Sequence, residues 1–109
     1  MIDLNSIDYK EMFDKMPDSV DKENAIDLIQ KCIDKQGIDL TIVRCMEEYA
    51  ELIQELSKSL RNNCDRDRLL EELADATLCT TFIQLALNID EKDLNKAINT
   101  KLKHAENRL

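Results

Sequence analysis

The chain has 109 residues, of which 23 are acidic and 15 are basic, so its formal net charge at pH 7 is -8. This excess of acids argues against nucleic acid as a partner, because proteins that bind phosphate backbones present a Lys and Arg surface. A single glycine, a single proline and 43% hydrophobic residues are typical of one small all-α domain with few turns.

The sequence also bears on where the protein works. No basic segment followed by an apolar run opens the chain, which predicts no secretory signal. The most apolar stretch, 73–89, is shorter than the roughly 20 apolar residues of a membrane span and contains Asp75. The four cysteines form no CxxC pair, and reduced thiols are typical of a cytosol. We therefore expect a cytoplasmic protein without a membrane partner.

The first part of the chain divides into an acidic segment and the start of a helical domain. Residues 1–18 are weakly patterned, with at most a short helix at 8–16, whereas residues 19–109 are expected to form the domain. Apolar residues at helical spacing predict its first main helix at 21–36, which Gly37 ends.

Three further helices are predicted by the same spacing and by capping residues. A long second helix is expected at 39–61 with Asp39 as its N-cap. Asp65 is expected to cap a third helix that runs to about residue 88. Asp90 should open a fourth helix that continues to the C-terminus.

Two acidic pairs stand out on the second and third predicted helices. Glu48 and Glu51 are spaced i, i+3, as are Glu72 and Asp75, so each pair lies on one side of its helix. The second pair interrupts an otherwise apolar stripe, so its carboxylates are expected to point into the bundle. Buried carboxylates need a partner, and too few cationic side chains lie in register to supply it.

A divalent cation would remove the repulsion within such a cluster. Ligation by oxygen alone favours Mg2+ or Mn2+ over Zn2+, and Mg2+ held by carboxylates commonly completes its shell with water and substrate phosphate. The pattern therefore predicts a metal site that acts on phosphates. A ferritin-like di-iron site is excluded because the chain has no Glu-x-x-His pair.

Other charged residues near these pairs have two readings each. Glu47 and Glu71 are turned about 100° from the acidic pairs. Each is therefore expected to be an exposed surface charge rather than a direct metal ligand. Lys101 and Arg108 fall on the expected core-facing seam of the fourth helix. They either face the acidic site or extend along the seam to solvent.

The motif Glu47-Glu48-x-x-Glu51, followed by Glu72-x-x-Asp75, resembles the EExxE and ExxD signature of the MazG-like all-α nucleoside triphosphate pyrophosphohydrolases. The resemblance extends over about residues 23–109. The related phosphoribosyl-ATP pyrophosphohydrolases would have a histidine soon after the second motif, where this chain has Leu78-Cys79-Thr80.

The resemblance implies a role for each matching residue. It implies that Mg2+ is held by Glu48, Glu51, Glu72 and Asp75. Lys101 and Arg108 would contact the substrate phosphates, and Glu47 or Glu55 would orient the attacking water. The implied reaction converts a (d)NTP and water to the (d)NMP and pyrophosphate, which clears unwanted or excess nucleotides.

We therefore expect an all-α, MazG-like bundle of four main helices that hydrolyses nucleoside triphosphates with Mg2+. Because the third helix is apolar on more than one side, a homodimer or homotetramer is expected. The alternative is a helical interaction or oligomerisation module without enzymatic activity. The preferred base cannot be inferred, since the aromatic residues belong to no base-reading pattern.

Overall fold

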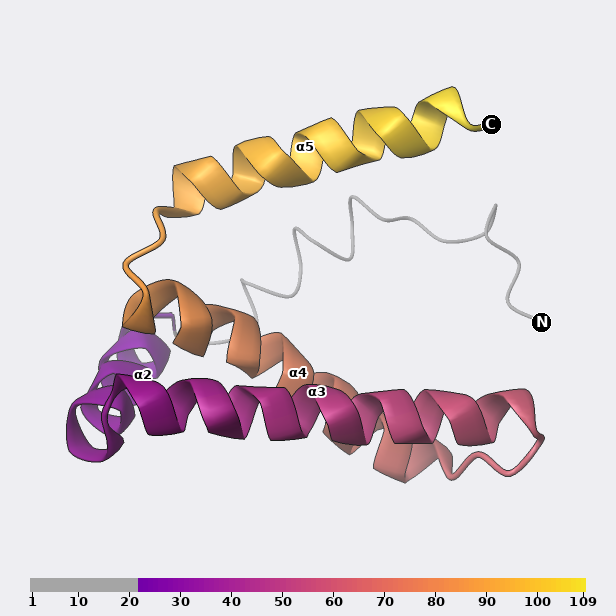
Figure 1. Cartoon of the computed structure of the whole chain (residues 1–109), viewed down its shortest axis with the longest axis horizontal. Helices are drawn as coiled ribbons and strands as arrows, with labels where there is room; N and C mark the ends of the chain where they lie inside the picture. Colours follow the sequence, from indigo (N-terminus) through magenta and orange to yellow (C-terminus); the bar gives the residue numbers. More distant parts are fainter. Residues whose placement is uncertain (1–21) are drawn as a thin grey trace.

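A computed structural model describes residues 22–109, and over this range the protein is all-helical, with four helices and no strands. In chain order they are α2 (Lys22–Gln36), α3 (Ile38–Leu60), α4 (Arg66–Ala86) and α5 (Glu91–Asn107) (Figure 1). The all-α prediction is confirmed for this range, and the helix ends lie within about two residues of the predicted ones. The short helix predicted at 8–16 lies outside the described residues.

Gly37 forms the junction between α2 and α3. Its φ of 89° is in the region that favours glycine, and its N–H donates to the Ile33 carbonyl over 2.8 Å, which closes α2. Gly37 is also the N-cap of α3, and its carbonyl accepts from the Thr41 N–H at 3.1 Å. The prediction that Asp39 caps α3 is therefore wrong. Asp39 lies within the first turn, because one residue both ends α2 and begins α3.

The two other predicted caps are confirmed. The Asp65 carboxylate accepts from the backbone N–H groups of Asp67 at 3.1 Å and Arg68 at 3.3 Å. The Asp90 carboxylate accepts from the Lys92 N–H at 2.9 Å. Each cap satisfies donors that the first turn of a helix leaves without an intrahelical acceptor, which fixes where α4 and α5 begin.

The helices α3 and α4 form an antiparallel hairpin, joined by residues 61–65 (Figure 1). Cys45 of α3 and Cys79 of α4 are buried between them, and the Cys45 thiol donates to the Cys79 carbonyl over 3.8 Å. Ala76 is buried in the same interface. This hairpin is the main interhelical contact of the described residues, and it sets which parts of α3 and α4 face each other.

The small apolar core lies where α2 packs across the hairpin. Ile29 and Ile33 are buried against Ala86, and Phe82 and Leu85 pack around them. Both isoleucines are among the apolar residues at helical spacing that predicted α2. This core places α2 at the end of the hairpin where α3 begins and α4 ends (Figure 1).

The helix α5 lies apart from the other three and has no buried residue (Figure 1). Lys101 and Arg108 are exposed, so the prediction that they lie on a core-facing seam is wrong for the described part of this chain. The turn at Asn88, with a φ of 56°, directs α5 away from the hairpin. The apolar stripe of α5, which includes Ile98 and Leu102, consequently has no counterpart in the described helices.

Large apolar side chains are exposed on the hairpin as well. Leu73 is 42% exposed and Leu78 is 49% exposed, although they lie about 140° apart around α4. The prediction that this helix is apolar on more than one side is confirmed. On α3, Val43 and Met46 are exposed in the same way.

The cysteines differ in exposure. Cys45 and Cys79 are buried, Cys32 is half-buried and Cys64 is exposed in the link between α3 and α4. Burial, followed by the neighbouring Cys45, raises the pKa of the Cys79 thiol to about 12. None of the helices between residues 22 and 109 is long and apolar enough to cross a membrane.

Candidate metal centre

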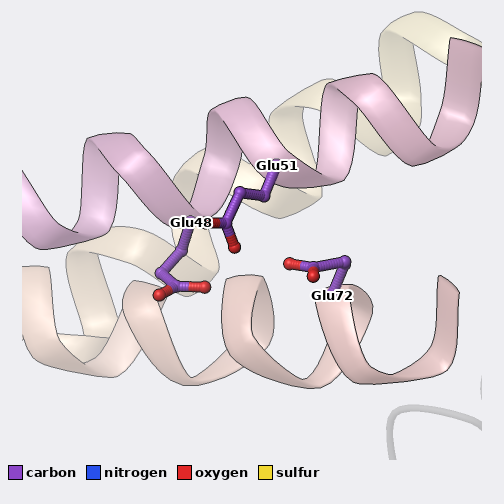
Figure 2. A group of neighbouring side chains, drawn as sticks. All are labelled: Glu48, Glu51 and Glu72. Carbon is purple, nitrogen blue, oxygen red and sulfur yellow. The ribbon is translucent and has the colours of Figure 1, made fainter. Parts of the chain in front are cut away.

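Three glutamates direct their carboxylates into one space between α3 and α4 (Figure 2). Glu48 and Glu51 come from α3, and Glu72 comes from α4. One carboxylate oxygen from each lies within 4.8 Å of the other two. The antiparallel hairpin therefore brings together three of the four residues that were predicted to hold a metal.

Asp75, the fourth, lies against Glu48 but outside this group of three. Glu72 is 6% exposed and points into the interior, as predicted. Asp75 is exposed, so the same prediction is wrong for Asp75. Three residues along an α-helix correspond to a rotation of about 300°, which leaves Asp75 about 60° around α4 from Glu72, at the edge of the interface.

The electrostatics of the group reflect two pairs of acids across the hairpin. Burial, followed by the charge of Asp75 and a hydrogen bond between the two carboxyl groups, raises the pKa of Glu48 to about 6. Burial likewise raises the pKa of Glu72, followed by the charge of Glu51 and a hydrogen bond to it. Because carboxyl groups share a hydrogen bond only when one is protonated, the group favours an added positive charge, either a proton or a cation.

Two oxygens of the group are buried without a hydrogen-bond donor among the described residues: Oε2 of Glu48 and Oε2 of Glu72. Leaving a buried acceptor unsatisfied is costly, so such atoms call for a ligand. Oxygens bound to one Mg2+ lie about 2.1 Å from the ion, which allows separations up to about 4.2 Å. The observed limit of 4.8 Å is close to that value. A set of carboxylates alone suits a hard divalent cation.

Glu55, predicted as one of two residues that orient water, has other partners. It is 3% exposed, and its Oε1 accepts from Arg68 Nε at 2.8 Å and from Lys58 Nζ at 3.0 Å. The hydrogen bond from Lys58, followed by the one from Arg68, lowers the pKa of Glu55. Its carboxylate is thus occupied in joining the end of α3 to the start of α4.

Arg68, which was not predicted as a site residue, lies beside the acidic group. Its hydrogen bond to Glu55 raises its pKa, and the charges of Glu72 and Glu51 contribute in the same direction. It is therefore a cation beside the acidic group, with 58% of its side chain exposed. The i, i+4 spacing between Arg68 and Glu72 in the sequence was the feature that indicates that the two side chains lie near each other.

The remaining predicted site residues lie elsewhere. Glu47 is exposed on α3, one residue before Glu48. Lys101 lies on α5 and Arg108 is the C-cap residue that follows it. This helix makes no extensive contact with the hairpin, so within the described chain the two cations are not brought to the acidic group.

The chain matches none of the protein-family models, curated proteins or solved structures with which it was compared. The likeness of its acidic motifs to the MazG-like signature is a resemblance of sequence pattern alone.

The raised pKa of Glu48 predicts how the stability of the metal-free protein depends on pH. Its ordinary pKa is 4.5 and its folded value is about 6, so between these values the folded state binds more protons than the unfolded state. Stability must then fall as pH rises through this window. We expect the thermal midpoint in a chelator to decrease from pH 4.5 to 6. The lowered pKa of Glu55 acts in a different window, below pH 4.5.

The matched variants for this measurement are Glu48→Gln and Glu47→Gln, which remove the same charge from a semi-buried and an exposed position. Glu48→Gln should flatten the pH dependence, and Glu47→Gln should leave it close to wild type. Equal slopes for the two variants would contradict the assigned environment of Glu48.

Proposed function

We propose that this protein is a Mg2+-dependent nucleoside triphosphate pyrophosphohydrolase of the MazG-like type. The observation that carries the proposal is the buried, unpartnered Oε2 of Glu72, which lies among carboxylates rather than beside a donor. Within residues 22–109 no ion pair accounts for this oxygen, since the ion pair of the neighbouring Arg68 is with Glu55.

The proposed metal ligands are Glu48, Glu51, Glu72 and Asp75, with Mg2+ as the ion and Mn2+ as a possible substitute. When bound, such an ion lowers the pKa of a coordinated water and neutralises charge on the phosphates. It would also bring an anionic substrate to a chain whose net charge is -8.

The proposed reaction is hydrolysis of the bond between the α and β phosphates. The water oxygen forms a bond to phosphorus, the bridging P–O bond breaks, and the products are the nucleoside monophosphate and pyrophosphate. The bridging oxygen leaves with one of the two products, and the proton lost by the water passes to solvent. Of the two carboxylates proposed to orient that water, only Glu47 is without an ion pair in the part of the chain that the structure describes.

Arg68 gains a proposed role from its position. A guanidinium beside carboxylates that hold a metal is placed to donate to phosphate oxygens, which Arg recognises through its fixed fork of N–H groups. Glu55 would then act as a positioning residue, because it accepts from Arg68 Nε at 2.8 Å and leaves the terminal N–H groups free to contact phosphate.

We also propose that the active form is a homodimer or homotetramer. The apolar stripe of α5 and the exposed leucines of α4 lack partners within the described chain, and a second copy would supply them. The same surfaces favour the alternative function, a helical oligomerisation module. That alternative does not account for the unpartnered oxygens of Glu48 and Glu72.

The first test is turnover with Mg2+ on a panel of NTPs and dNTPs, with the products separated. We expect pyrophosphate and the monophosphate from at least one substrate. Glu51→Ala should reduce the rate by at least about 100-fold, since even partners of metal ligands typically contribute 10- to 100-fold. Its circular dichroism should stay helical, because the substitution relieves repulsion.

Glu71→Ala is the control, because it removes an exposed carboxylate next to Glu72 on the same helix. It should turn over like wild type. An active Glu51→Ala variant at saturating Mg2+ would refute the proposed ligand set, and an inactive wild type that still self-associates would favour the oligomerisation module.

The position of α5 predicts that Lys101 and Arg108 serve the acidic site of another copy. Lys101→Ala and Arg108→Ala should raise KM for the triphosphate. Mixing the inactive Glu51→Ala chain with a Lys101→Ala/Arg108→Ala chain should restore about a quarter of wild-type activity, since half of the dimers are hybrids and each hybrid has one intact site. No recovery after subunit exchange would contradict action between subunits.

A further inference from the structure

A small cavity adjoins the acidic group on the side of α2. Its volume is about 230 Å³, and its wall is formed by α2, α3 and α4. Glu48 and Asp75 line one end, and the rest of the wall includes Cys32, Gln36 and Phe82. A larger hollow of about 750 Å³ at the junction of α2 and α3 is lined by none of the four acids.

The cavity is continuous with the acidic group, because Glu48 and Asp75 belong to both. A ligand whose phosphates are held at the carboxylates would therefore extend its remaining part into this cavity. Pockets for drug-sized molecules measure roughly 300–1,000 Å³, so a space of this size suits one ring system rather than a whole nucleotide. Leu78 and Phe82 give it the apolar wall that a planar ring requires.

One polar group in the wall is held in a defined orientation. The Thr41 hydroxyl, in a residue that is 1% exposed, donates to the Gly37 carbonyl over 2.7 Å. Because its only proton is used there, this hydroxyl must accept from Gln36, whose Nε2 lies 2.9 Å away. The junction at Gly37 thus fixes which end of the Gln36 amide faces Thr41.

In this orientation the Gln36 amide still has hydrogen-bonding groups available to a ligand. Its Oε1 and its second Nε2 proton have no hydrogen-bond partner within residues 22–109. An amide that offers an acceptor beside a donor matches the paired donor and acceptor on the edge of a nucleobase. The amide therefore supplies what the apolar wall lacks, which is a means of reading a polar ring edge.

We propose that this cavity binds the nucleobase of the substrate and that Gln36 is a specificity-determining residue. The inference rests on the proposed function, since it places a nucleotide with its phosphates at the carboxylates. The inference adds that binding in the cavity requires a nucleoside. Inorganic polyphosphates are therefore expected to bind at the acids without entering the cavity.

The cysteines provide a binding measurement that does not depend on hydrolysis. Cys32 lines the cavity and is half-buried, whereas Cys64 is exposed in the link between α3 and α4. The full-length protein is treated with N-ethylmaleimide, and labelling of each cysteine is followed by mass spectrometry. A nucleoside monophosphate with Mg2+, at ten times its Kd, should slow labelling of Cys32 about tenfold and leave Cys64 unchanged. Pyrophosphate with Mg2+ should slow neither.

The matched variants are Gln36→Leu and Gln30→Leu. Both residues are half-buried glutamines on α2, but Gln30 hydrogen-bonds to Asp34 and does not line this cavity. Gln36→Leu should raise KM for the nucleotide about tenfold or more, while the inhibition constant of tripolyphosphate with Mg2+ stays constant. Gln30→Leu should change neither constant. Gln36→Glu, which offers two acceptors, should shift preference toward guanine, whose edge offers two donors.

The outcomes separate this inference from the function on which it rests. Protection of Cys32 by nucleotides without any hydrolysis would support the cavity and refute the proposed reaction. Hydrolysis with unprotected Cys32 and an unchanged KM in Gln36→Leu would support the reaction and overturn the cavity assignment. Equal protection by pyrophosphate and by the monophosphate would also overturn it, since a base would then be unnecessary.

Discussion

Four carboxylates face one another across a single antiparallel helix pair. Glu48 faces Asp75 and Glu51 faces Glu72, and each pairing raises the pKa of the more buried member. Unpartnered acids at such a contact would push α3 and α4 apart. The rest of the hairpin opposes that repulsion through apolar packing and through the ion pairs of the buried Glu55 with Lys58 and Arg68. This arrangement of four carboxylates is consistent with a site that is completed by a bound cation.

Two local features hold the acids in register. At one end, Gly37 both closes α2 and opens α3, so no spare residue separates the two helices. At the other, Asp65 caps α4 and Arg68 reaches across to Glu55 at 2.8 Å. Because helices are rigid over a few turns, fixing both ends of the hairpin determines which side chains meet in its middle.

Helical periodicity was sufficient to predict the four described helices, and the caps at Asp65 and Asp90 followed from residue type. Burial was predicted less well, because periodicity identifies an apolar stripe but not the neighbour that covers it. The apolar stripe of α5 was predicted to face the core, yet no described residue covers it. Glu55 is buried because a cation thirteen residues further along the chain reaches it, and no pattern within one helix indicates such a pairing.

Binding of a divalent cation by the acidic group is tested most directly by a Mg2+ titration of the thermal midpoint. An ion that binds only the folded state stabilises it by about 2.7 kcal/mol at one hundred times its Kd. The midpoint of the wild type and of Glu71→Ala should therefore rise with Mg2+, and that of Glu72→Ala should not. A wild-type midpoint that stays constant across millimolar Mg2+ would contradict the claim.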